Sequence, residues 1–336
     1  MHIVSRRFIA LLLAFSMPMG MSYAADESML VKAWLEKMIK AEHSVNYQGT
    51  LIYRYRDEMV AMNIIRVQGD NGMLEHLTSL NGTPGAVVRN SHRVKCMLPN
   101  FKTPLVYDNS DIKVRSAATL AERIEEISRY YQLSLAGVAR VADRTSQKVV
   151  ITPRDQHRYG YQIWIDQQSG LLLKLEHLTI KGEVLEQMIY TNIEFFGDQT
   201  PLHVRQLIAE NAFDINQKQT IPTVPLHNNG ANNWVVKYIP SGFALANYQR
   251  STDRQQSPFE HIVFSDGLAA VSVFIEKQDK SDAFSGVSQR GATNAYLAVI
   301  DDYQVVVMGE VPLETLELIG KSVRHTPNNN SLSKIP

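Results

Sequence analysis

Five short segments in residues 135–196 alternate apolar and polar side chains, and this pattern constrains the fold more than any other feature. The segments are Leu135 to Asp143, Gln147 to Thr152, Tyr159 to Asp166, Leu171 to Thr179 and Leu185 to Phe196. Alternation with a period of about two is typical of half-exposed strands, and the intervening glycine-containing turns join antiparallel neighbours. The pattern therefore predicts an antiparallel meander with a wide, concave apolar face.

Shorter strands and two helices are predicted before the meander. Tyr47 to Arg56 alternates in the same way and is followed by its hairpin partner at residues 60–67, with further short strands up to residue 97. Apolar residues recur at helical spacing over residues 28–43 and from Ala118 to Leu133. Each helix is expected to lie on the sheet with its apolar side, because such a stripe must be buried.

The first 24 residues have the features of an export signal. Arg6 and Arg7 precede an apolar run too short to span a bilayer, and cleavage is expected between Ala24 and Ala25. The mature chain would then be exported to the periplasm of a Gram-negative bacterium as a soluble protein.

The remaining chain divides into two domains and a tail. Residues 25–216 form the larger domain, and residues 217–233, rich in asparagine and proline, show neither strand nor helix period and form a linker. Residues 234–326 are expected to contain a strand before Pro240, a hairpin of residues 261–265 and 268–276 about the Asp266-Gly267 turn, and strands at residues 293–300 and 303–309. A helix opens at Pro312, and residues 327–336 form a tail. The expected fold class is α+β with mainly antiparallel β-structure.

Composition and motifs argue against several classes of function. Lysine plus arginine and aspartate plus glutamate both number 34, so no overall positive charge attracts nucleic acid. Cys96 is the only cysteine and is interpreted as a small apolar strand residue. No nucleophile elbow, phosphate loop or zinc motif occurs, and the histidines are scattered singly. We therefore expect neither catalytic residues nor a cofactor or metal.

One polar cluster, Thr152 to Tyr161, lies between two apolar strands. Arg154, His157 and Arg158 make it a candidate site for an anionic headgroup or an acidic partner. The alternative is a charged hairpin loop that only keeps the protein soluble.

The same cluster, TPRDQHRYGY, followed by DxxSGLLLK at residues 166–174, resembles the RseB/MucB family of periplasmic sigma-E regulators. Segments similar to that family's C-terminal domain follow in order: YIPSGF at residues 238–243, SDGLA at 265–269 and GEVPL at 309–313. YQGT at residues 47–50 is similar to its first strand, so the resemblance spans nearly the whole mature chain.

The resemblance implies a fold and a function. The fold would be a half-open β-barrel covered by helices, similar to lipoprotein carriers of the LolA/LolB type, with a smaller C-terminal domain. The protein would bind the periplasmic domain of a transmembrane anti-sigma factor (RseA/MucA type) and protect it from site-1 proteolysis. Lipopolysaccharide or lipoprotein acyl chains would release the anti-sigma factor from the protein.

The concave face of the meander is the candidate lipid-binding groove. Its assigned wall residues are Tyr161, Ile163, Ile165, Leu173, Leu175, Ile189 and Ile193. A plain core closed by the two helices is the alternative. A carrier without a regulatory role and an exported hydrolase are the competing functions, and a homo-oligomer is left open.

Overall fold

The computed structural model describes residues 21–69, 72–90, 93–97, 105–108, 124–197, 199–210, 234–251, 259–277 and 284–326. The expected signal segment up to residue 20, the linker and the tail lie outside these residues. The expected cleavage point between Ala24 and Ala25 falls within the first helix, α1 (Met21–Ser44).

A single antiparallel sheet of 11 strands forms the first domain. Its first half comprises β1 (Tyr47–Tyr55), β2 (Glu58–Gly69), β3 (Gly72–Ser79), β4 (Ala86–Asn90), β5 (Arg93–Met97) and β6 (Leu105–Asp108). Its second half comprises β7 (Tyr131–Val141), β8 (Arg144–Pro153), β9 (Gly160–Asp166), β10 (Leu172–Leu178) and β11 (Val184–Phe195). The predicted meander is therefore confirmed.

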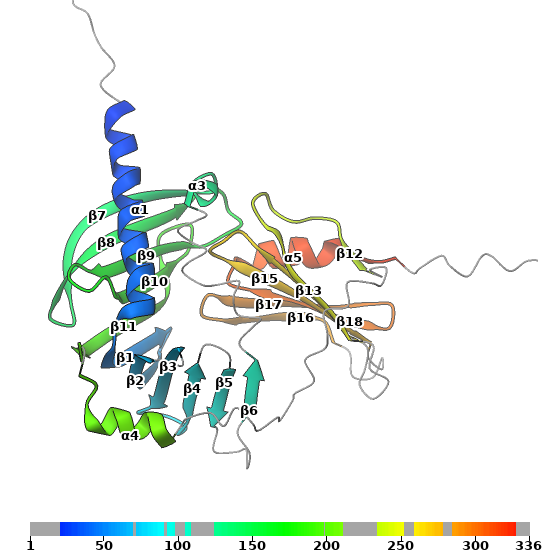
Figure 1. The fold of residues 1–336 in the computed structure, drawn as a ribbon. Helices are drawn as coiled ribbons and strands as arrows, with labels where there is room; N and C mark the ends of the chain where they lie inside the picture. Colours follow the sequence, from blue (N-terminus) through cyan, green and yellow to red (C-terminus); the bar gives the residue numbers. More distant parts are fainter. Residues whose placement is uncertain are drawn as a thin grey trace, which may run out of the picture.

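The two halves meet in the middle of the sheet. Strand β1 pairs with β11 from Tyr47 opposite Phe195 to Tyr55 opposite Glu186, which leaves β6 and β7 as the two edges. The sheet bends around α1 without closing into a complete barrel (Figure 1). The expected α+β class with a half-open barrel is confirmed.

Helix α1 covers one face of this sheet. Val31 and Leu35 are fully buried, and they pack with Ile124 and Ile127 of the short helix α3 (Ile124–Ile127) against strands β7, β8 and β9. Helix α4 (Leu202–Glu210) follows β11. Among the described residues, no helix is long and apolar enough to cross a membrane.

The helix predicted from Ala118 to Leu133 is wrong in its second half. Within the described residues the helix ends at Ile127, and Tyr131 already begins β7 opposite Pro153. Ile124, Ile127 and Tyr131 are all buried, as helical spacing suggests. However, residues 131–133 pair with β8 as a strand. The buried side chains at helical spacing therefore lie partly in helix α3 and partly in strand β7.

The second domain is a six-stranded antiparallel sheet with one helix. Its strands, in the order in which they pair, are β13 (Ala244–Ser251), β14 (Phe259–Ser265), β15 (Ala270–Lys277), β18 (Tyr303–Gly309), β17 (Thr293–Ile300) and β16 (Gly286–Arg290). Helix α5 (Leu313–Ser322) packs on β17 and β18, beside a small ribbon of β12 (Trp234–Val236) and β19 (Val323–His325). Figure 1 shows this domain beside the turns at one end of β8 to β11.

Candidate functional site

The polar cluster predicted from the sequence lies at the joint between the two domains. Arg158 is fully buried there, and its guanidinium makes ion pairs with Asp266 at 3.3 Å and with Asp155 at 3.2 Å. The same guanidinium donates a hydrogen bond to the Ser241 carbonyl oxygen at 2.5 Å. Asp266 and Ser241 belong to the second domain, so one buried cation holds both domains.

Aromatic rings enclose the Arg158 guanidinium. Its carbon lies 4.9 Å from the ring centre of Tyr130, 5.5 Å from Tyr131 and 5.0 Å from Phe243, distances at which a cation is attracted to a ring face. Gly242 has φ +91°, and a Cβ there would lie 2.6 Å from the Tyr130 ring. Only glycine therefore allows the two domains to approach this closely.

Asp266 connects this cation to the turn between β14 and β15. One of its carboxylate oxygens accepts the amide hydrogens of Leu268 at 2.9 Å and Ala269 at 2.7 Å, which fixes the turn. The other accepts the Tyr131 hydroxyl at 2.8 Å. Burial, together with the nearby charge, raises the pKa of the Tyr131 phenol, so this hydroxyl remains a donor.

A second contact between the domains centres on Glu186 in β11. Its carboxylate accepts hydrogen bonds from the Tyr53 hydroxyl at 2.6 Å and from the Ala292 amide at 2.9 Å, and His177 Nδ1 lies 2.6 Å away. Ala292 belongs to the turn between β16 and β17. Its neighbour Gly291 has φ +66°, a left-handed conformation that favours glycine, and a Cβ there would displace the Glu186 carboxylate, 2.2 Å away.

This carboxylate should make the joint sensitive to acid. Burial alone would raise its pKa, but the bonds from His177, Tyr53 and the Ala292 amide outweigh burial and lower the pKa of Glu186 from 4.5 to about 2. A lowered pKa contributes stability that is present above pH 4.5 and is lost as the pH falls through about 2. We expect the urea midpoint of the wild type to fall across this window. The urea midpoint of Glu186→Gln should fall less steeply over the same pH range. Equal slopes for the two proteins would show that Glu186 does not cause this loss of stability.

The other two residues of the predicted cluster differ in their surroundings. His157 lies at the joint, where its ring nitrogens are 3.4 Å from the Tyr238 hydroxyl and 3.4 Å from the Thr315 hydroxyl of the second domain. Arg154 is exposed and donates to the Ser128 carbonyl oxygen at 3.2 Å. The anions beside Arg158, Asp155 and Asp266, are side chains of the protein itself.

The seven candidate groove residues do not form one wall. Tyr161, Ile163 and Ile165 belong to the core cluster under α1, and Leu175 packs against this cluster. Leu173 belongs to a different cluster with Trp164, and Ile189 and Ile193 pack against that cluster. The predicted shared face of Leu173 and Leu175 is wrong because a register shift in β10 between Leu172 and Lys174 separates them. Lipid binding by any of the seven remains a prediction.

Sequence reasoning missed the partners that make the joint. The sequence predicts the Asp266-Gly267 turn, but no local pattern indicates that Asp266 or Glu186 contacts another domain. The signal that could have found Asp266 is its position at a turn beside apolar strands, where a carboxylate requires a partner. Within the described part of the chain, no three metal-binding side chains come together.

The fold and the joint define a class of two-domain proteins in which a large open sheet is held against a smaller α+β domain by buried charged contacts. The MucB/RseB N-terminal domain model matches residues 30–219, and the MucB/RseB C-terminal domain model matches residues 228–324. The chain belongs to the MucB/RseB family.

Individual relatives agree with this assignment. The sigma factor AlgU regulatory protein MucB of Pseudomonas aeruginosa is 30% identical over 94% of this chain and 96% of its own length. The sigma-E factor regulatory protein RseB of Escherichia coli K12 is 24% identical over 87% of this chain and 90% of its own. In the solved MucA/MucB complex of Pseudomonas aeruginosa, the matched chain has a TM-score of 0.66 and 28% identity, covering 89% of this chain and 99% of that one.

Proposed function

We propose that this chain is a periplasmic negative regulator of a sigma-E-type envelope stress response. It acts by binding the periplasmic domain of a transmembrane anti-sigma factor of the RseA/MucA type, and it is not an enzyme. The observation that supports this most is the similarity, across both domains, to MucB in a structure solved together with MucA. The expected export signal supports the periplasmic location.

We further propose that binding protects the anti-sigma factor from site-1 proteolysis and that lipopolysaccharide or lipoprotein acyl chains reverse it. A ligand releases the partner only if it binds the free regulator more tightly than the complexed one. The largest possible shift equals that difference in binding free energy. Each buried methylene contributes about 0.8 kcal/mol, so part of one acyl chain is enough to shift this balance. Because α1 fills one face of the sheet, lipid must displace this helix or use another surface.

Protection from proteolysis tests this proposal. The anti-sigma factor's periplasmic domain is digested by its site-1 protease alone, with this protein, and with this protein plus lipopolysaccharide. We expect slow digestion with the protein and fast digestion once lipopolysaccharide is added. Fast digestion in both mixtures would contradict the inhibitory role, whereas slow digestion in both would contradict only lipid sensing.

A further inference from the structure

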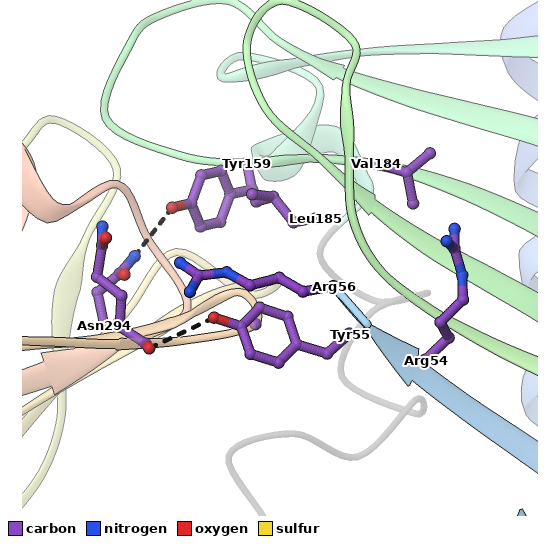
Figure 2. A pocket seen from close by; sticks show the side chains of 9 residues that line it. Arg54, Tyr55, Arg56, Tyr159, Val184, Leu185 and Asn294 are labelled. Atoms are coloured by element: carbon purple, nitrogen blue, oxygen red, sulfur yellow. Dashed lines mark hydrogen bonds between the residues drawn. The ribbon is translucent and has the colours of Figure 1, made fainter. Parts of the chain in front are cut away.

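A small pocket lies beside the Glu186 contact, with walls from both domains. Its volume is about 210 Å³, and it lies between the β1–β2 turn, the start of β11 and the β16–β17 hairpin. Figure 2 shows Arg56 reaching between Tyr55 and Tyr159 toward Asn294, with Arg54 beside Val184. The pocket therefore joins positive side chains of the first domain to a hairpin of the second.

Two arginines, Arg54 and Arg56, line this pocket. Among the described residues, neither Arg54 nor Arg56 has a hydrogen-bond acceptor or an ion-pair partner, although Arg56 lies 5.1 Å from the Tyr55 ring centre. Two carboxylates of the neighbouring strands have other partners: Glu186 accepts from Tyr53 and Ala292, and Glu58 pairs with Arg290 at 3.7 Å. The residues that line the pocket carry two positive charges and no negative one.

The Tyr159 hydroxyl adds a donor near Arg56. The Asn294 amide nitrogen donates to the Val311 carbonyl oxygen at 2.7 Å, and its second hydrogen goes to the Tyr159 oxygen at 2.9 Å. A carbonyl can only accept, so the orientation of the amide is fixed and the Tyr159 oxygen is an acceptor in this bond. Its own hydrogen remains available, and burial raises the pKa of this phenol, which keeps it protonated.

We propose that this pocket binds a phosphate group, with Arg56 and the Tyr159 hydroxyl as donors and Arg54 as a second positive charge at the other end of the pocket. Guanidinium groups bind phosphate oxygens through paired, charge-assisted hydrogen bonds, and a hydroxyl completes such a donor set. The phosphate is either a free ion or the headgroup of a lipid whose chains pass Val184 and Leu185 at the rim. Phosphate binding is independent of the proposed function, whereas the lipid source rests on its lipid-sensing part.

Binding in this pocket would also affect the joint. Arg56 and Tyr159 come from the first domain and Asn294 from the second, so a ligand that contacts all three favours the arrangement in which the domains are joined. A phosphate compound should therefore raise the unfolding temperature of the protein.

Calorimetric titration of the full chain tests the proposal. The probes are inorganic phosphate, dihexanoyl phosphatidic acid, and dihexanoylglycerol, which has the same chains without phosphate. We expect both phosphate compounds to bind, and Arg56→Gln to weaken both by roughly tenfold or more, as expected for loss of a charged hydrogen bond. Arg140→Gln is the matched control, because Arg140 is exposed and pairs with Asp143 in a distant turn. It should bind as the wild type does.

The outcomes separate the two sources. Tighter binding of the phosphatidic acid than of inorganic phosphate identifies a lipid headgroup, and equal affinities identify a free phosphate ion. Absence of binding by both, equal binding of dihexanoylglycerol, or unchanged affinity in Arg56→Gln would overturn the proposal. The anti-sigma factor is not present in this titration, so its result is independent of the protection experiment.

Discussion

Replacing Arg158 with methionine is expected to lower the free energy of unfolding by about 3–5 kcal/mol, because the change leaves Asp266 charged, buried and without its cation. Methionine keeps much of the side-chain volume inside the rings of Tyr130, Tyr131 and Phe243. The loss would therefore arise mainly from the charge. Urea unfolding followed by tryptophan fluorescence would measure it.

Two further variants distinguish the ion pair from general damage. Adding Asp266→Asn to Arg158→Met removes the isolated charge but keeps an oxygen for the amides of Leu268 and Ala269, so it should restore part of the loss. Arg154→Met removes an exposed arginine from the same loop and should change stability by about 0.5 kcal/mol or less. If Arg158→Met had an effect as small as that of Arg154→Met, the joint would not depend on this ion pair.

Leu35→Ala in α1 should have the second large effect. Leu35 is 0% exposed and packs on the sheet, so its truncation should lower the free energy of unfolding by about 2–5 kcal/mol. Leu30, in the same helix, is 48% exposed and provides the control, with an expected change of about 0.5 kcal/mol or less for Leu30→Ala. Equal effects of the two substitutions on the urea midpoint would mean that α1 does not fill this face.

Local patterns predicted most of the fold. The alternation in residues 135–196 and the turns between its segments predicted the meander, since both depend only on neighbouring residues. The pairing of β1 with β11 joins segments more than 130 residues apart, and no local pattern specifies it. Strand β16 was missed because all five of its residues are exposed and show no apolar alternation.

The polar cluster at the joint can be located from the sequence, but its contacts cannot. The cluster around Arg158 stood out because charged residues are unusual between apolar strands. Its anion could not be identified, since Asp266 lies 108 residues later in another domain. The division of the groove residues has two causes. A register shift in β10 displaces Leu173, and Ile189 pairs with Lys174 and not with Leu175.

The proposed regulatory role depends on a direct complex with the anti-sigma factor. Size-exclusion chromatography with light scattering, on the mature chain mixed with the periplasmic domain of the anti-sigma factor from the same organism, tests it directly. We predict a complex whose mass includes both proteins and which Arg140→Gln leaves unchanged. Separate elution of the two proteins at concentrations well above micromolar would contradict the account.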